Sequence, residues 1–174
     1  REDLIFDSYS RSIYNGYATQ SYSKLKNIIL YFIEKCDNVF NTKMNKLLFY
    51  ADFLSYKTYG RGMTGLAYKA IQFGPVPVRW DRVYSLIDGV YPEMVEFSSG
   101  ICGTKLCSDL SPDCSSFTAE ELSILEKVLD IFKSTSASQI SELSHSEEAW
   151  TKYCNTNQMI SYNEAFGLKA FDIY

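Results

Sequence analysis

Apolar residues recur at helical spacing in two adjacent segments near the start of the chain. Residues 21–36 carry one apolar face, which predicts a helix packed on one side. Residues 41–60 carry two apolar stripes, so this second helix is either central and buried on both sides or exposed as a partner-binding surface. The expected caps are Ser21 or Ser23 for the first helix, and Asn41 or Thr42 with a stop at Gly60 for the second.

The middle of the chain has the pattern of short strands interrupted by one helix. Residues 65–73 predict a strand, and residues 79–89 predict a helix that ends at Gly89. Residues 93–107 predict two short strands joined at residues 98–100, where two serines and a glycine give a hairpin signal. We therefore expect one small antiparallel sheet in this part of the molecule.

Serine and threonine caps mark further helices in the last third of the chain. The segments that begin at Thr118 and Ser136 each carry a glutamate or glutamine three residues later, which is the capping-box signature. We expect the second of them to break into two short helices near His145, and a further cap at Ser161. The whole pattern predicts a mainly α fold with a small antiparallel β-sheet (α+β), in a single compact helical domain.

The stretch at residues 74–77, Gly-Pro-Val-Pro, is the most unusual in the chain because it places two prolines in four residues. Proline has no N–H and biases the residue before it away from helical geometry. We therefore expect a stiff corner between a strand and the next helix, through which no strand ladder runs. A phosphate-binding loop needs several free backbone N–H groups, so the two prolines also argue against a nucleotide site.

The composition is that of a globular protein and limits its partners. Hydrophobic residues make up 46% and aromatic residues 16% of the 174 residues, so the chain can bury a core without disulfides or metal. The formal net charge of −4 argues against nucleic acid as the main partner of this segment. There is no apolar run of membrane-spanning length and no signal-peptide pattern, so we expect a cytoplasmic protein that does not bind membranes.

The five cysteines are scattered and odd in number, which is typical of free thiols in a reducing compartment. Cys102, Cys107 and Cys114 lie closest together in the sequence. Their spacings are wider than those of common zinc sites, and no fourth ligand lies nearby. We therefore predict no metal site and no cofactor.

Catalytic motifs are missing from the sequence. His145 is the only histidine, so any hydrolytic triad would depend on it, and there is no nucleophile elbow, phosphate-binding loop or dinucleotide fingerprint. We interpret His145 as a helix-junction residue that forms local hydrogen bonds, with contact to a partner as the alternative. Lys46 and Asp52 lie on the most apolar helix, and if buried each needs a partner, because an unpaired buried charge is costly. We predict that the protein is not an enzyme.

Four segments occur in an order seen in a known family: TKMNKLLFYADFLSYKTYG, YKAIQFGPVPVRWDRVYSLI, AEELSILEKVL and ISELSHSEEAWTKY. Together they resemble the Panacea domain, also called the SocA-like or GepA-like domain, over roughly residues 24–172. The most specific parts are residues 73–76 and the segment from Leu143 to Trp150. The first two segments are most similar to members that carry a helix-turn-helix domain upstream. Residues 1–20 are then expected to be a linker or entry segment from a missing upstream domain, which fits a chain that begins at Arg1, and residues 21–174 the Panacea-like domain.

The resemblance implies an antitoxin of a bacterial or phage-associated toxin–antitoxin system, which binds and neutralises a protein toxin encoded next to it. It also allows an adaptor role, in which the antitoxin delivers its toxin to a protease, and contact with DNA only through the missing upstream domain. The alternative function is the regulatory or dimerising half of a helix-turn-helix transcriptional regulator, for which a homodimer would be expected.

The resemblance implies no catalytic residues. Residues that match the family motifs are instead candidates for defining the fold or for contacting the partner, because interfaces use aromatic anchors. Arg79 and Trp80 lie just beyond the proline-rich stretch, which would present them to a partner. The full set of candidate residues is Lys46, Tyr50, Phe53, Gly74, Pro75, Val76, Arg79, Trp80, His145 and Trp150.

Overall fold

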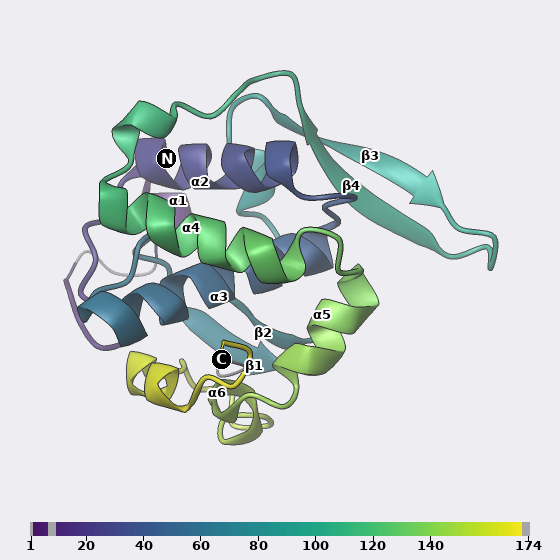
Figure 1. Ribbon diagram of the computed structural model, residues 1–174. Helices are drawn as coiled ribbons and strands as arrows, with labels where there is room; N and C mark the ends of the chain where they lie inside the picture. Colours follow the sequence, from purple (N-terminus) through teal and green to yellow (C-terminus); the bar gives the residue numbers. More distant parts are fainter. Residues whose placement is uncertain (1, 7–9, 172–174) are drawn as a thin grey trace.

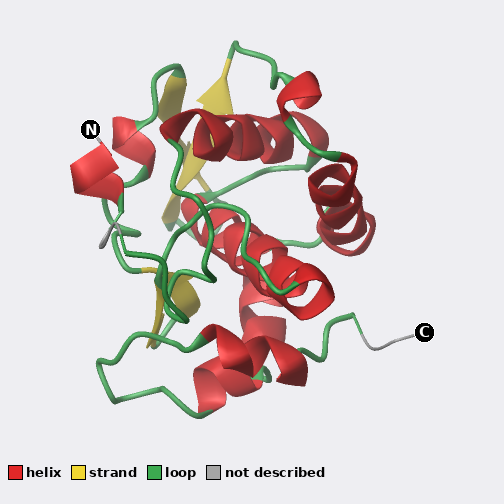
Figure 2. Ribbon diagram, turned by 90° about the vertical axis from the view of Figure 1, so that its left-hand side faces the viewer, coloured by secondary structure: helices red, strands yellow, loops and turns green. Residues whose placement is uncertain are grey.

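The computed structural model describes residues 2–6 and 10–171 and shows a mainly helical domain with small antiparallel sheets (Figures 1 and 2). The predicted fold class is confirmed. The α-helices are α1 (Glu2–Ile5), α2 (Tyr22–Lys35), α3 (Asn41–Tyr59), α4 (Ala119–Phe132), α5 (Ala137–Ser144) and α6 (Glu148–Thr151). The strands are β1 (Tyr68–Ile71), β2 (Gly74–Pro77), β3 (Val90–Glu96) and β4 (Cys102–Ser108), and the short 3₁₀ helices are η1 (Tyr84–Leu86), η2 (Cys114–Ser116) and η3 (Tyr162–Gly167).

Helix α3 runs through the centre of the domain. All of its side chains from Lys43 to Tyr56 are buried. Helices α2, α4 and α5, strand β2 and the 3₁₀ helix η3 pack around it (Figure 1). The two apolar stripes therefore mean burial on both sides rather than an exposed binding surface. Gly60 ends the helix at a φ of +76°, which confirms the predicted stop.

Helices α2, α4 and α5 begin where the capping signals placed them. The hydroxyl of Ser21 accepts a hydrogen bond at the start of α2. The capping boxes at Thr118 and Ser136 are both formed, and they open α4 and α5. Ser161 caps a 3₁₀ helix, η3. Short polar side chains at these positions fix the helix starts because they satisfy N–H groups that have no partner within the helix.

The predicted cap of α3 is wrong. Asn41 and Thr42 lie inside the first turn of the helix, and Phe40 takes the N-cap position without a side-chain hydrogen bond. Phe40 is held there by an antiparallel bridge to Lys105 of β4. A tertiary contact thus sets the start of this helix, where the local sequence suggested a capping side chain.

Residues 79–89 do not form the predicted α-helix. They form turns and the 3₁₀ helix η1, in which N–H groups bond three residues back, as from Leu86 to Val83. The hydroxyl of Tyr84 donates to Asn45 Oδ1 of α3 at 2.6 Å, so burial of this side chain fixes the local backbone. A helix this short is marginal by itself, and tertiary packing overrides its periodic pattern.

Residues 74–77 form a strand, so the predicted corner is wrong. They make up β2, which pairs with β1 in antiparallel register, with Lys69 opposite Val76 and Ile71 opposite Gly74. In an antiparallel pair only alternate N–H groups point at the partner strand. Prolines two residues apart can therefore both place their missing N–H on the outer side, which an edge strand tolerates.

The β3–β4 hairpin is confirmed, with residues 98–100 as its turn, but it forms a sheet separate from that of β1 and β2. It projects from the body of the domain, and we call residues 90–108 the arm (Figure 1). Most β3 side chains are exposed. The base of β4 is anchored to the body, because Leu106 is buried and its N–H donates to Val39 O at 2.9 Å.

The described residues before α2 pack on the domain. Ile5, Phe6 and Ala18 are buried, and a carboxylate oxygen of Glu2 accepts from the N–H of Tyr22 at 3.0 Å. Residues 7–9 of this segment lie outside the described residues. Its role as a linker stays a prediction.

Within residues 2–6 and 10–171, no helix is long and apolar enough to cross a membrane. No group of three or more histidine, cysteine, aspartate and glutamate side chains in these same ranges could hold a metal ion. The five cysteines are free thiols: Cys36 is buried, and Cys102, Cys107, Cys114 and Cys154 are at least partly exposed.

Candidate functional site

The turn of the β1–β2 hairpin is held by side chains from the α5–α6 region. Three consecutive backbone carbonyl groups of this turn each form a hydrogen bond with a side chain. The hydrogen-bonding capacity of the turn is therefore met by the body of the domain and not by solvent. We call these contacts the hairpin clamp. They are Trp150 Nε1 to Ile71 O at 2.6 Å, His145 Nε2 to Gln72 O at 2.8 Å, and Ser141 Oγ to Phe73 O at 3.0 Å.

Both ring nitrogens of His145 face backbone carbonyls. Nδ1 lies 2.7 Å from Ser141 O, one turn back in α5, while Nε2 faces Gln72 O. The ring also packs edge-on against Trp150, with centroids 4.4 Å apart. A neutral imidazole donates to one of these carbonyls and a protonated ring to both, and in neither form is a nitrogen open to a substrate. This geometry favours the interpretation of His145 as a helix-junction residue.

Gly74 lies where β2 passes close to α3 and α5. Its φ is +105°, a backbone conformation that residues other than glycine rarely adopt. A Cβ atom at this position would lie 2.6 Å from Ser144 Oγ and 2.7 Å from Lys46 Cε. Gly74 is therefore required twice, by its backbone conformation and by the close approach of its neighbours.

Lys46 is fully buried beneath this strand. Among the described residues its Nζ has no hydrogen-bond partner. Burial lowers the pKa of its amine from 10.5 to about 7. The expectation that a buried Lys46 has a partner is therefore wrong. The interior tolerates the amine because it can lose its proton, which removes the cost of an unpaired buried charge.

Asp52, on the same helix, is also fully buried, but unlike Lys46 its charged group has hydrogen-bond partners. Its Oδ1 accepts from the N–H groups of Met63 and Thr64 at 2.7 and 2.8 Å. Its Oδ2 accepts from the hydroxyls of Thr64 and Tyr68 at 2.5 and 2.6 Å. Burial raises the pKa of this carboxyl, and the hydrogen bonds oppose the rise. Asp52 thereby fixes the loop that leads into β1.

Tyr50 and Phe53 anchor the later part of the chain to α3. Tyr50 stacks on Phe132 of α4 with ring centroids 4.8 Å apart. Phe53 stacks on Tyr162 of η3 at 4.4 Å. Both side chains are fully buried, so they act as core residues that hold α4 and η3 against the central helix.

Glu147 is a buried residue whose role the sequence did not predict. A glutamate at a helix start is explained by the helix dipole alone. In the structure its carboxylate accepts from the Tyr50 hydroxyl at 3.2 Å and from the N–H groups of Lys169 and Ala170 at 2.8 and 3.1 Å. Burial raises the pKa of this carboxyl. Glu147 therefore ties the chain after η3 to the core, a contact across more than 20 residues that no local pattern reveals.

Most of the candidate residues thus lie around the β1–β2 hairpin and stabilise the fold. Six are buried, and two more form the hairpin clamp. The buried residues are Lys46, Tyr50, Phe53, Gly74, Pro75 and Val76, and the clamp residues are His145 and Trp150.

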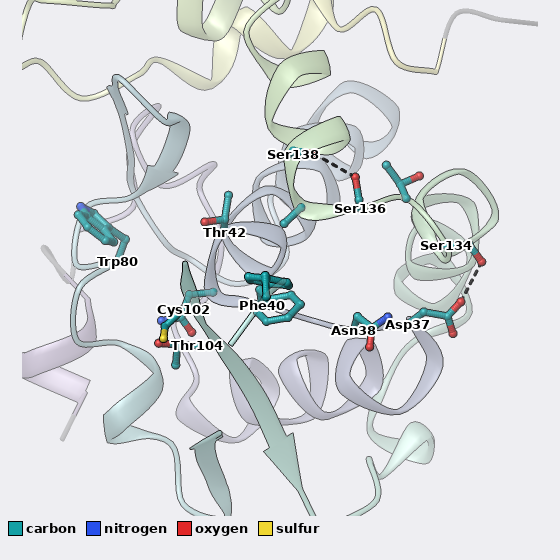
Figure 3. A pocket seen from close by; sticks show the side chains of 15 residues that line it. Asp37, Asn38, Phe40, Thr42, Trp80, Cys102, Thr104, Ser134, Ser136 and Ser138 are labelled. Atoms are coloured by element: carbon teal, nitrogen blue, oxygen red, sulfur yellow. Dashed lines mark hydrogen bonds between the residues drawn. The ribbon is translucent and has the colours of Figure 1, made fainter. Parts of the chain in front are cut away.

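Trp80 lies apart from them, at a cleft beside the arm (Figure 3). The cleft has a volume of about 700 Å³ and lies between the outer edge of β4, the start of α3 and the connection from α4 to α5. We call it the arm cleft. Phe40 and Phe97, with ring centroids 5.4 Å apart, give it an apolar part, and Asp37 is the one charged side chain among its described lining residues. Arg79 is half-buried and does not line it.

The sequence did not predict the arm cleft. Its walls come from four separate segments, and only Trp80 stands in the set of candidate residues. The one available signal was the apolar character of Phe97 and Ile101 on either side of the hairpin turn. Apolar residues that flank an exposed turn are unusual in a strand pair without a third neighbour.

The sequence model of the family described as "Antitoxin SocA-like, Panacea domain" matches residues 44–151, which is more than half of the chain. The chain belongs to this family. The matched part of the Panacea domain begins inside α3 and ends with α6, so it contains the hairpin clamp and the arm. A search of curated proteins found no match, and neither did a search of solved structures. The wider boundary of residues 21–174 and the upstream helix-turn-helix domain stay predictions.

Proposed function

We propose that this Panacea domain neutralises a protein toxin by binding it directly. The match to an antitoxin family over residues 44–151 carries the proposal. The chemistry of the described residues supports binding over catalysis. The ring nitrogens of His145 face carbonyl groups, and the buried carboxylates of Asp52 and Glu147 accept hydrogen bonds from the fold itself. The groups best suited to acid–base catalysis therefore stabilise the domain.

The proposal is tested by co-expression with the protein encoded next to this gene. We expect the neighbouring product to arrest growth when it is expressed alone, and growth to return when this domain is expressed with it. The two purified proteins should form a complex that survives size-exclusion chromatography. Neutralisation should require about one molecule of the domain per molecule of toxin, because binding is stoichiometric whereas an enzyme would act at a small fraction of that ratio.

The control is a variant with a destabilised core, Asp52→Ala, which should restore growth less well than the wild type. Growth arrest that persists although folded domain is present in excess, together with no detectable complex, would contradict the proposal. Restored growth at a small fraction of one equivalent would contradict the binding mechanism in particular.

A further inference from the structure

The arm exposes large apolar side chains. Met94 and Ile101, near its tip, are 66% and 67% exposed, and Tyr91 and Phe97 are exposed as well. Tyr91 and Met94 lie on β3, and Phe97 and Ile101 lie in the connection from β3 to β4, in a hairpin that projects from the domain (Figure 1). Several exposed apolar side chains on one projecting element are typical of a surface that is covered by a partner.

The outer edge of β4 is only partly covered. The turn bond from Phe97 N to Ile101 O and the bond from Leu106 N to Val39 O fix which residues face outward, because the direction alternates along an antiparallel strand. The N–H groups of Cys102 and Thr104 therefore point away from β3. No described residue accepts from them, and this open stretch of edge forms one wall of the arm cleft.

The cleft combines this edge with an apolar floor. Phe40 and Phe97 lie against Gly103, where a Cβ atom would come within 3.0 Å of both rings. The absence of a side chain at Gly103 keeps the backbone of β4 close to the rings. An extended peptide could hydrogen-bond to the open edge and place one apolar side chain on these rings, which is how β-augmentation gains both affinity and specificity.

Charge identifies the chemistry of the occupant. Residues 88–113, which contain the arm and its two connections, hold five acidic residues and one lysine. The rest of the chain then has sixteen acidic and sixteen basic residues, so this segment carries the whole formal net charge of −4. The charged residue that lines the cleft, Asp37, is also acidic. A complementary partner surface is basic.

The same charge distribution disfavours other occupants. Nucleic acid would be repelled by an acidic arm. A second copy that paired its own arm with the open edge of β4 would bring two segments of net charge −4 side by side, and such like-charge juxtaposition is unfavourable. The observations therefore favour a different protein with basic residues.

We propose that the toxin places an extended, basic segment in the arm cleft, pairs its backbone with β4 at Cys102 and Thr104, and sets one apolar side chain against Phe40 and Phe97. This inference rests on the proposed function, since it names the surface through which that function acts. The first residues of α3 line the cleft, whereas the buried part of this helix and the hairpin clamp support the scaffold and take no direct part in binding.

A matched pair of arginine substitutions tests the cleft. Ser138 and Ser23 are both exposed serines at the second residue of a helix that follows a serine cap, but only Ser138 lines the cleft. Ser138→Arg should obstruct the cleft and repel a basic segment, raising the Kd for the neighbouring gene product at least tenfold in calorimetry. Ser23→Arg should change it less than twofold, because it places the same charge at the second residue of a helix without touching the cleft.

The outcomes distinguish a wrong docking site from a wrong proposed function. Wild-type binding that Ser138→Arg leaves unchanged would overturn the arm cleft as the docking site and leave the antitoxin function standing. Dimerisation of this domain in analytical ultracentrifugation, abolished by Ser138→Arg, would assign the cleft to a second copy and also overturn the inference.

A peptide probe decides the matter even if the neighbouring product does not bind. The acetylated, amidated hexapeptide Lys-Val-Lys-Leu-Lys-Val should shift the amide NMR signals of residues 102–104 and 134–138, while Glu-Val-Glu-Leu-Glu-Val should not. Ser138→Arg should remove the shifts and Ser23→Arg should keep them. Equal shifts with both peptides, shifts elsewhere on the domain, or none at all would overturn the proposed chemistry of the cleft.

Discussion

The two hairpins of this domain are both antiparallel strand pairs, but one is buried in the body and the other projects from it. The β1–β2 hairpin is short, contains two prolines and a glycine at positive φ, and lies between α3 and the α5–α6 region. The β3–β4 hairpin is longer and projects away from the body with its side chains mostly exposed (Figure 1). The first is held by side chains that reach its turn carbonyls. The second is hydrogen-bonded to the body near Leu106, and Phe97 beside its turn packs on Phe40.

In this chain, the residues that carry the resemblance to the Panacea family lie mostly in the scaffold and not on the surface. A buried hairpin needs particular residues at each position, since a single added atom at Gly74 meets its neighbours. An exposed hairpin tolerates many residues of similar character. Most of the candidate residues therefore lie in the part that is least available to a partner, and only Trp80 among them lines the arm cleft.

The largest expected effect comes from removing the carboxylate that fixes the entry to β1. Asp52→Ala leaves four buried donor groups without an acceptor, and we expect it to lower the free energy of unfolding by about 3–5 kcal/mol. Glu96→Ala, on the arm, should cost less than about 0.5 kcal/mol, as is usual for exposed positions. Urea denaturation followed by circular dichroism measures both. Similar losses for the two variants would remove the energetic distinction between the hairpins.

Two glycines at positive φ give the next comparison. Gly74→Ala combines backbone strain with contacts below 3 Å to Ser144 and Lys46, and should destabilise the domain by about 2–4 kcal/mol. Gly100→Ala, in the turn of the arm at a φ of +84°, meets no atom within 4 Å and should cost only about 1 kcal/mol of backbone strain. The same denaturation experiment applies, and an equal cost would show that Gly74 is required only for its backbone conformation.

The buried amine of Lys46 predicts a pH dependence. The unfolded amine keeps its proton up to a pKa of 10.5, while the folded amine loses it near pH 7. The unfolded state therefore binds more protons above pH 7, and stability rises with pH there. Between pH 7 and 9 we expect a gain of about 2 kcal/mol, since one proton corresponds to about 1.4 kcal/mol per pH unit.

Lys46→Met should be more stable than the wild type at pH 7 and should lose most of this dependence, which denaturation curves at several pH values would show. Measurement stops at pH 9, because the pKa of the Cys36 thiol, raised to about 11 by burial, acts with the opposite sign above it. A slope that Lys46→Met leaves intact would show that another group, such as Lys43, is responsible.

The smallest effect on stability is expected at the tip of the arm. Met94→Ser and Ile101→Ser should each change the free energy of unfolding by less than about 0.5 kcal/mol, because both side chains are exposed in the free domain. Their effect should appear only in the complex with the toxin, as weaker binding. A marked loss of stability would mean that the arm packs on the body more than its exposure indicates, and the contrast between the hairpins would weaken.

Local patterns predicted the helices and the second hairpin well, because these depend on neighbours in sequence. The capping boxes at Thr118 and Ser136 and the turn at residues 98–100 are formed as expected. The errors arose where distant contacts decide. The hydrogen bond from Tyr84 to Asn45 of α3 accompanies a 3₁₀ turn where a regular helix was predicted. Phe40 takes the N-cap position of α3, where it also bridges to β4. Residues 74–77 form a strand because Pro75 and Pro77 lie where the backbone N–H would point away from β1, so the pairing with β1 loses no hydrogen bond.

The sequence by itself determined the fold class and the family membership, since periodicity, caps and motifs are all written locally in the chain. It also indicated which residues matter to the fold. Only the tertiary structure decided their roles. Among the described residues it left the Lys46 amine without a hydrogen-bond partner and gave Asp52, on the same helix, four donors. It also joined His145 and Trp150 to a hairpin more than 70 residues away and left much of the arm exposed. Burial and partnership depend on which segments meet in space, and no single segment carries that information.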